Sequence, residues 1–218
     1  MSCTSRCSAV EQNFDGRVAA HQLEQYRRKG ASRSTRQLLR AIQDAGIAGS
    51  TVIDVGGGVG AIAMELLDAG AARAIIVEAS AAYLHVAHEE TSRRQLGDRV
   101  DFLHGDFVSL AHEVSVADVV TLDKVVCCYP DMKPLLERST DRASRLYGIV
   151  YPRDAWWVRL MTAAENFLRR MKRSAFRVYV FDNTAIDVAI RSAGFHRLEE
   201  ERGLVWITAV YQRSTAKK

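Results

Sequence analysis

Short apolar runs rich in β-branched residues alternate with segments of helical periodicity along most of this sequence. The runs predict buried strands at residues 51–55, 74–77, 100–103, 116–122 and 146–151. Between them, apolar residues recur at helical spacing, as in residues 61–67 and 83–87. Strands that are apolar throughout are typical of parallel sheets with helices on both faces. The pattern therefore predicts an α/β protein built from βαβ units.

The two ends of the sequence add other patterns to this core. Residues 14–26 are weakly helical, and residues 34–45 form a helical stripe in which Ser34 and Gln37 have the spacing of a capping box. Residues 184–193 predict a late helix, and residues 196–201 with 204–211 predict a closing β-hairpin around Gly203.

Residues 156–182 read as an insertion between the fifth strand and the closing elements. One apolar helix face is predicted there, consisting of Trp157, Leu160, Met161, Ala164, Leu168 and Met171. Basic residues flank that face. The insertion is either the substrate side of a pocket or a packing helix with a solvated basic face.

A glycine-rich turn after the first strand carries the strongest functional signal. Gly56, Gly58 and Gly60 allow the backbone to lie flat against a ligand at a helix N-terminus, which makes a nucleotide pocket. With Ala61, the glycines also satisfy the dinucleotide fingerprint G-x-G-x-x-G/A. Asp54 favours a different ligand, because its carboxylate repels a pyrophosphate and attracts a sulfonium or ammonium group.

Acidic residues also mark the ends of the later strands. Glu78 ends the second strand and can accept both ribose hydroxyls of an adenosine. After the third strand, Gly105 permits close approach of a flat ring and Asp106 can accept from an adenine amino group, although Asp106 could equally cap the next helix. The loop that starts at Asp123 faces the reacting group, since ligands of open α/β sheets bind outside the carboxyl ends of the strands.

The run DVGGGVG at residues 54–60 resembles the first motif of class I S-adenosylmethionine (SAM)-dependent methyltransferases, and the Gly105–Asp106 pair is similar to a later one. The resemblance implies a Rossmann-like, seven-stranded, mostly parallel sheet with a closing antiparallel hairpin, an N-terminal helical lid and an inserted helix after strand five. It also implies methyl transfer with SAM as cofactor. The residues expected to bind SAM are Tyr26, Asp54, Gly56, Gly57, Gly58, Gly60, Glu78, Ala79, Gly105, Asp106, Phe107, Asp123 and Lys124.

The run LDKVVCCYPD at residues 122–131, together with residues 33–39, is similar to magnesium-protoporphyrin O-methyltransferases and ubiquinone-type methyltransferases. This narrower resemblance implies a small anionic or hydrophobic acceptor and favours O-methylation. Arginines suit such a molecule because they pair with carboxylates in a planar, two-point geometry. We expect Tyr129, Arg153, Trp157 and Arg159 to contact the acceptor.

The length of 218 residues and the mass of 24.3 kDa suit one α/β domain. We divide it into a lid (1–33), a cofactor-binding core (34–155), a substrate-side insertion (156–182) and a closing helix and hairpin (183–218). The sequence has no apolar run long enough for a transmembrane segment and no signal-peptide core at the N-terminus, so we expect a cytoplasmic protein.

Cysteine spacing and charge bear on metals and partners. Cys3, Cys7, Cys127 and Cys128 lack the spacing of a zinc site, so we expect reduced thiols and no metal. The formal charge is +4, and basic residues crowd residues 27–40 and 169–173 as solvated helix faces or as a site for an anionic partner. We expect no nucleic-acid substrate, because the loop after strand four lacks an Asn/Asp-Pro-Pro-aromatic run.

Two other function classes share part of this pattern. An NAD-dependent oxidoreductase would use the glycines and Glu78 but leaves Asp54 and Asp106 without a role. A non-catalytic SAM-binding partner or sensor would keep the cofactor residues and lack an acceptor pocket. No catalytic residue is predicted, because methyl transfer depends mainly on alignment and a carboxylate acceptor needs no base. His21 and His104 are the histidines that could serve as a base.

Overall fold

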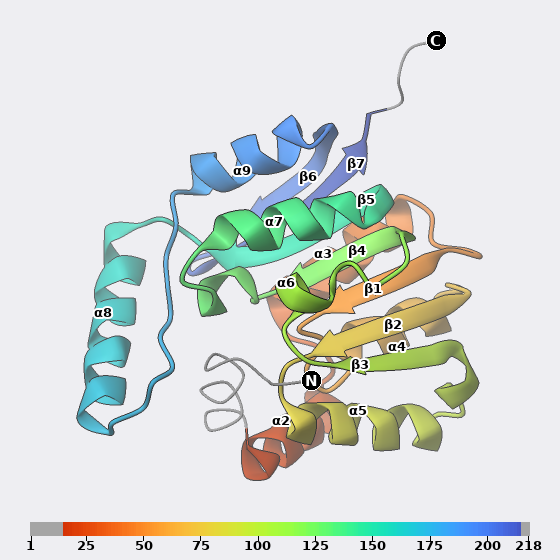
Figure 1. Cartoon of the computed structure of the whole chain (residues 1–218), viewed down its shortest axis with the longest axis horizontal. Helices are drawn as coiled ribbons and strands as arrows, with labels where there is room; N and C mark the ends of the chain where they lie inside the picture. Colours follow the sequence, from red (N-terminus) through yellow and green to blue (C-terminus); the bar gives the residue numbers. More distant parts are fainter. Residues whose placement is uncertain (1–14, 215–218) are drawn as a thin grey trace.

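Seven strands form one sheet in the order β3-β2-β1-β4-β5-β7-β6 (Figure 1). This computed structural model describes residues 15–214. Strands β1 to β5 pair in parallel, and β7 runs antiparallel to both β5 and β6. The strands are β1 (Thr51–Val55), β2 (Arg73–Glu78), β3 (Val100–His104), β4 (Ala117–Asp123), β5 (Ala143–Pro152), β6 (Phe195–Arg202) and β7 (Trp206–Arg213). The predicted mostly parallel sheet with a closing hairpin is confirmed.

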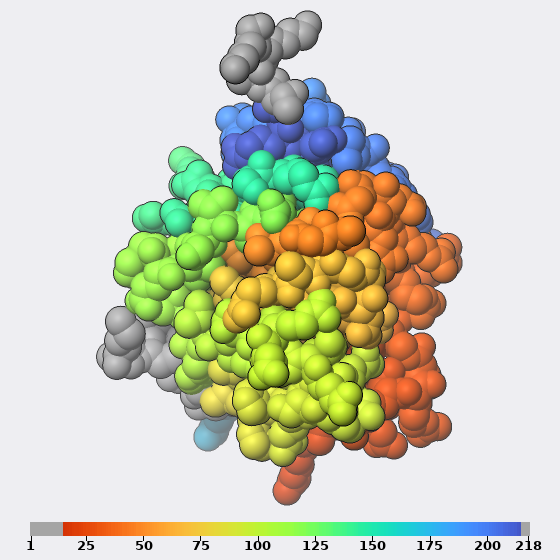
Figure 2. Space-filling model, turned by 90° about the vertical axis from the view of Figure 1, so that its right-hand side faces the viewer, coloured from red at the N-terminus to blue at the C-terminus, as the bar shows by residue number. Residues whose placement is uncertain are grey.

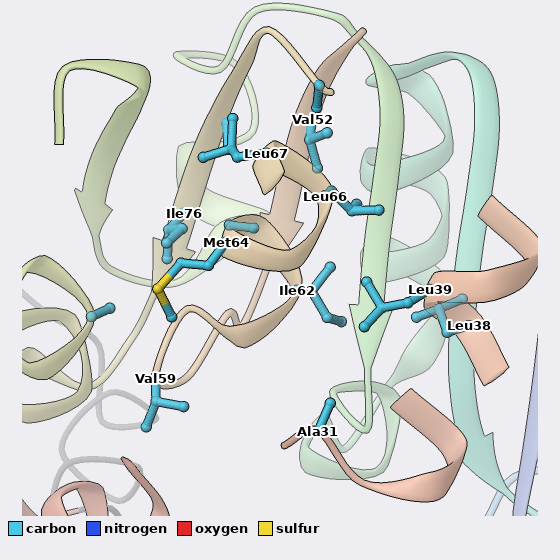
Figure 3. Close-up of a cluster of buried hydrophobic side chains, with 14 of the residues drawn as sticks. Ala31, Leu38, Leu39, Val52, Val59, Ile62, Met64, Leu66, Leu67 and Ile76 are labelled. Atoms are coloured by element: carbon cyan, nitrogen blue, oxygen red, sulfur yellow. The ribbon is translucent and has the colours of Figure 1, made fainter. Parts of the chain in front are cut away.

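Helices cover both faces of this sheet. On one face lie α2 (Gly16–Lys29), α3 (Arg33–Asp44), α4 (Ala61–Asp68) and α5 (Ala81–Arg93); on the other lie α6 (Phe107–Leu110), α7 (Met132–Asp141) and α9 (Asn183–Ser192). Figure 3 shows how Ile62 of α4 points toward Leu39 of α3, while Met64 lies beside Ile76 of β2. Each face thus has its own apolar core.

Helix α3 begins at a different residue from the one that the sequence predicts. Its N-cap is Ser32, whose Oγ accepts from the backbone N–H of Thr35 at 3.4 Å. The predicted cap, Ser34, is buried inside the helix, and its carbonyl oxygen accepts from Thr208 Oγ1 of β7 at 3.3 Å. The earlier start places Thr35 in the first turn, where its hydroxyl reaches the end of β4.

Helix α8 (Trp156–Met171) stands apart from both layers, at one end of the sheet (Figure 1). The chain leaves β5 and returns to α9 at the same place, because Asn183 Oδ1 accepts from Asp154 N at 2.7 Å and Asn183 Nδ2 donates to Pro152 O at 3.0 Å. The returning segment runs along α8, where Asn166 exchanges two hydrogen bonds with the backbone of Val178. None of the helices within residues 15–214 combines the length and apolar character needed to cross a membrane.

Candidate functional site

The carboxyl ends of β1, β2, β3 and β4 open into one cavity of about 830 Å³. Helix α2 and parts of residues 165–178 complete its wall. Twelve of the predicted SAM-binding residues meet there: Tyr26, Asp54, Gly56, Gly57, Gly58, Glu78, Ala79, Gly105, Asp106, Phe107, Asp123 and Lys124. Gly60 does not line the cavity; it is the N-cap of α4, with a φ of 79°.

The glycine turn is fixed between β2 and the loop after β4. Gly56 has a φ of 64° and donates its N–H to Val77 O at 2.7 Å. A Cβ on Gly56 would lie 2.6 Å from Cγ2 of Val125, and a Cβ on Gly57 would lie 2.9 Å from Oδ2 of Asp54. Both positions therefore require glycine for close packing, and the result is a bare backbone along the cavity wall.

Asp54 lies beneath this turn with only 1% of its surface exposed. The register of β1 and β4 sets Thr121 opposite Asp54, and Thr121 Oγ1 donates to Asp54 Oδ1 at 2.7 Å. Among the described residues, none hydrogen-bonds the buried Oδ2 atom. Burial raises the pKa of Asp54 to about 7, with Asp123 and Glu78 adding to the rise and the Thr121 hydrogen bond opposing it. The carboxyl group thus lies buried beside the cavity, with Thr121 fixing one of its oxygen atoms.

Glu78 is held at the end of β2 by backbone donors. Its carboxylate accepts from Gly58 N at 2.9 Å and from Ser80 N at 2.8 Å. Burial raises the pKa of Glu78, although these hydrogen bonds favour the charged form. Next to it, Ala79 O lies 3.2 Å from Nε2 of His104. The carboxylate is therefore fixed against the glycine turn rather than free to rotate.

Asp106 links the loop after β3 to the loop after β4. It caps α6 by accepting from Ser109 N at 3.3 Å, and it also accepts from the hydroxyl of Tyr129 at 2.5 Å. Gly105 donates its N–H to Glu78 O at 2.9 Å, and Phe107 is buried beside the cavity. The sequence alone did not reveal the contact between Tyr129 and Asp106, since it joins two loops 23 residues apart.

The start of α3 closes the cavity at the end of β4. Thr35 Oγ1 donates to Asp123 Oδ2 at 2.6 Å, and the ammonium of Lys124 donates to Ser32 Oγ at 2.9 Å. The same ammonium lies 3.4 Å from Asp123 Oδ1 and 5.5 Å from the ring centroid of Trp206. Neither Ser32 nor Thr35 is among the predicted site residues, although residues 33–39 and 122–131 together carry the narrower resemblance.

Helix α2 lies along the cavity. Gln22, Gln25, Tyr26 and Lys29 line it, and Figure 2 shows α2, in red, beside α5 in yellow-green. The Tyr26 hydroxyl donates to Glu65 of α4 at 2.6 Å, so the ring rather than the hydroxyl is what Tyr26 offers the cavity. Residues 1–14 of the predicted lid lie outside the described residues.

The side of the cavity opposite the glycine turn is built by α8 and the segment after it. Arg169 donates twice to Glu165 Oε1, at 3.0 and 2.6 Å, and its guanidinium carbon lies 5.0 Å from the ring centroid of Phe176. Val178 continues this wall. Tyr129, which the sequence predicts to contact the acceptor, also lines the cavity. The spacing of Glu165 and Arg169 by four residues is a sequence signal for such a pair.

Three predicted acceptor residues lie elsewhere. Arg153, Trp157 and Arg159 are not among the cavity-lining residues. Arg159 Nε donates to Asp154 at 2.5 Å, Trp157 Nε1 donates to Leu204 O at 3.2 Å, and the Arg153 guanidinium lies 5.3 Å from the Trp157 ring centroid. These contacts hold the three side chains near the start of α8 and the closing hairpin, away from the cavity.

The cavity holds thiols but no histidine among the described residues. Cys127 and Cys128 line it, and both thiols donate to Lys124 O, at 3.2 and 3.6 Å. The hydrogen bond with Cys127, together with burial, raises the pKa of Cys128, so this thiol is neutral at physiological pH. His21 and His104, the predicted candidates for a base, do not line the cavity.

Known proteins match this chain in part of its sequence and in its fold. Residues 52–144 match the family model described as a methyltransferase domain. No curated protein matches the sequence.

Two solved structures have the same fold. The SAH-bound magnesium protoporphyrin IX methyltransferase (ChlM) from Synechocystis PCC 6803 is 16% identical, with a TM-score of 0.72 over 96% of this chain and 100% of that chain. An O-methyltransferase family protein from Burkholderia thailandensis is 17% identical, with a TM-score of 0.70 over 94% of this chain and 62% of that chain. Residues 52–144 thus match a methyltransferase domain, and the chain shares the fold of these two methyltransferase structures.

Proposed function

We propose that this protein transfers a methyl group from SAM to a small acceptor that carries a carboxylate, with an oxygen atom as the favoured methyl acceptor. The observation that carries the proposal is the continuity of the cavity. Its volume of about 830 Å³ runs from the acidic residues at the strand ends to Arg169. That volume is near the upper end of the roughly 300–1,000 Å³ found for small-molecule sites, which supports room for a cofactor and an acceptor together.

The cofactor would lie against the glycine turn. In this proposal Glu78 accepts from the ribose hydroxyls, Asp106 accepts from the adenine amino group, and Asp54 attracts the cationic part of SAM. Buried carboxylates at this turn oppose a pyrophosphate, so the same geometry argues against NAD. The class I fold and the matched methyltransferase domain support this placement.

The acceptor would occupy the side formed by Tyr129, Arg169, Phe176 and Val178, which offers aromatic and apolar surface with one guanidinium. A flat molecule with a carboxylate fits that chemistry. A carboxylate oxygen attacks the sulfonium methyl without losing a proton, so the task of the protein is alignment in a site shielded from water. Similarity to the fold of a magnesium protoporphyrin IX methyltransferase supports a flat acidic acceptor of that kind.

Arg169→Gln tests the acceptor side. With magnesium protoporphyrin IX and a panel of aromatic carboxylic acids, we expect KM or Kd to rise about tenfold to a hundredfold, the usual effect of losing a hydrogen bond to a charged group. Glu165→Gln should lower KM or Kd for the same acceptors, because it removes a carboxylate that repels the acceptor. SAM affinity should stay the same in both variants.

Arg159→Gln is the matched control, because Arg159 lies on the same helix and outside the cavity. An equal rise in KM or Kd for the acceptor in Arg159→Gln and Arg169→Gln would contradict the proposed acceptor site. Binding of SAM without methylation of any acceptor in the panel would favour the non-catalytic SAM-binding alternative.

A further inference from the structure

Helix α8 directs its most apolar side toward solvent. The side chains of Trp156, Leu160, Phe167 and Met171 are 73%, 63%, 63% and 68% exposed. At about 100° per residue, these four positions fall within roughly 60° of the helix circumference. We call them the outer stripe. Monomeric soluble proteins seldom leave such a continuous apolar surface uncovered, so the outer stripe indicates a docking surface.

Polar contacts on the other side of α8 fix this orientation. Glu165 and Arg169 face the cavity, and Asn166 binds the backbone of Val178 at 2.7 and 2.9 Å. Val158 is the one residue of α8 that is buried. Turning the outer stripe inward would break these hydrogen bonds and remove the cavity wall, so the apolar side faces outward because of specific contacts.

The charge of α8 distinguishes between a second copy of the chain and an anionic surface as the partner of the outer stripe. Residues 156–173 contain five basic residues and one acidic residue, a net charge of +4 that equals the formal charge of the whole chain. Within residues 15–214, no acidic side chain pairs with Arg170, Lys172 or Arg173. A second copy docked on the same surface would bring like charges together, whereas an anionic surface would neutralise them.

We propose that α8 docks on an anionic lipid surface. The helix would lie in the plane of the interface, with the outer stripe entering the boundary between headgroups and acyl chains. Arg170, Lys172 and Arg173 would pair with lipid phosphates. An apolar stripe flanked by cations is the pattern of helices that bind at such interfaces. This docking does not depend on the identity of the methyl acceptor.

Flotation of the full chain with vesicles tests the proposal. We expect the protein to float with equimolar phosphatidylcholine and phosphatidylglycerol and to stay at the bottom with phosphatidylcholine alone. The double variant Leu160→Ser/Phe167→Ser should bind about tenfold or more weakly, because it removes apolar area from the interface. The triple variant Arg170→Gln/Lys172→Gln/Arg173→Gln should lose most of the dependence on anionic lipid and on salt.

The control is Val116→Ser/Val188→Ser, which removes two apolar side chains outside α8, each 55% exposed, and should float like the natural protein. Absence of flotation with anionic vesicles would overturn the proposal. So would a dimer in sedimentation velocity that Phe167→Ser dissociates, because a second copy would then be the occupant. Equal flotation by the Leu160→Ser/Phe167→Ser variant and the control would also overturn it.

Discussion

The carboxyl group of Asp54 lies beside the cavity but almost out of contact with water. Burial raises its pKa to about 7, so a large share of the molecules carry it protonated near neutral pH. A bound cation favours the charged form and lowers the pKa again. If SAM places its cationic groups near Asp54, as we propose, cofactor binding and ionisation of this side chain are linked.

This linkage predicts proton release. Below a pH of about 7, SAM binding should release protons, and affinity should rise as the pH increases through that value. Calorimetry in two buffers of different ionisation enthalpy measures the protons. Asp54→Asn should abolish the release and weaken SAM binding by roughly 1.5 to 3 kcal/mol.

The same variant has a second expected effect in the absence of ligand. A buried acid with a raised pKa destabilises the fold once it ionises, so stability from this group is lost as the pH rises toward about 7. Asp54→Asn without SAM should therefore gain stability relative to the natural protein above that pH. Proton-neutral SAM binding by the natural protein would show that Asp54 does not face the cation.

For single residues, the sequence predicts which acidic side chains lie at the strand ends, but not which residues hydrogen-bond them. Asp54, Glu78 and Asp106 follow from position alone, since the carboxyl ends of parallel strands meet at one edge. Their partners Thr121 and Tyr129 depend on strand register and loop packing, which a single sequence does not specify. Arg169 was missed as a site residue because the helix face that meets the cavity was unknown.

Among the elements, α2 is tied to α5 through one buried acid. Arg27 donates twice to Glu90, at 2.9 and 2.5 Å, and Arg93 donates to the same carboxylate at 2.9 and 2.6 Å. The hydrogen bonds from Arg93 and Arg27 outweigh burial and lower the pKa of Glu90 to about 2. The carboxylate therefore stabilises the fold above a pH of about 4.5, and this contribution is lost as the pH falls toward about 2.

Glu90→Gln should loosen α2 over the cavity. We expect a loss of roughly 1.5 to 3 kcal/mol in unfolding free energy at neutral pH, and faster amide exchange near Lys29 and Gly30. Added SAM should slow exchange there if α2 acts as a lid. Glu89→Gln is the control, since Glu89 is exposed and pairs only with His85 among the described residues. Unchanged exchange at Lys29 on adding SAM would contradict the lid.

Most elements were predictable because their patterns are unambiguous. The five parallel strands contain short apolar runs and lie between helical segments, and all five are present. Helix α8 also forms as predicted, but its expected apolar face is not buried: Leu160, Met161, Leu168 and Met171 are exposed. Periodicity shows that a helix has an apolar side, and it does not show whether that side meets the protein or something else.

At the scale of the whole molecule, ligand binding should raise the free energy of unfolding. At a hundredfold excess over Kd, SAM should add about 2.7 kcal/mol, or roughly 5–10 °C in Tm, because it binds the folded state alone. NAD should give no shift. Thermal unfolding with each ligand is sufficient, and stabilisation by NAD without any by SAM would contradict the proposed cofactor.

The hydrogen bonds of Asn183 bear on which segments of the sequence can be replaced without changing the fold. Asn183, at the start of α9, hydrogen-bonds the backbone of both Pro152 and Asp154 at the end of β5. Residues 155–182 therefore leave the sheet and return to it at nearly one point. A backbone hydrogen bond from Tyr179 N to Cys127 O at 2.8 Å ties this segment to the loop after β4. Exchanging residues 155–182 for a segment of another length would leave the strand order undisturbed, since the junction closes without it. A change in this segment can therefore alter one wall of the cavity and the exposed side of α8, while the glycine turn after β1 keeps its place in the sheet.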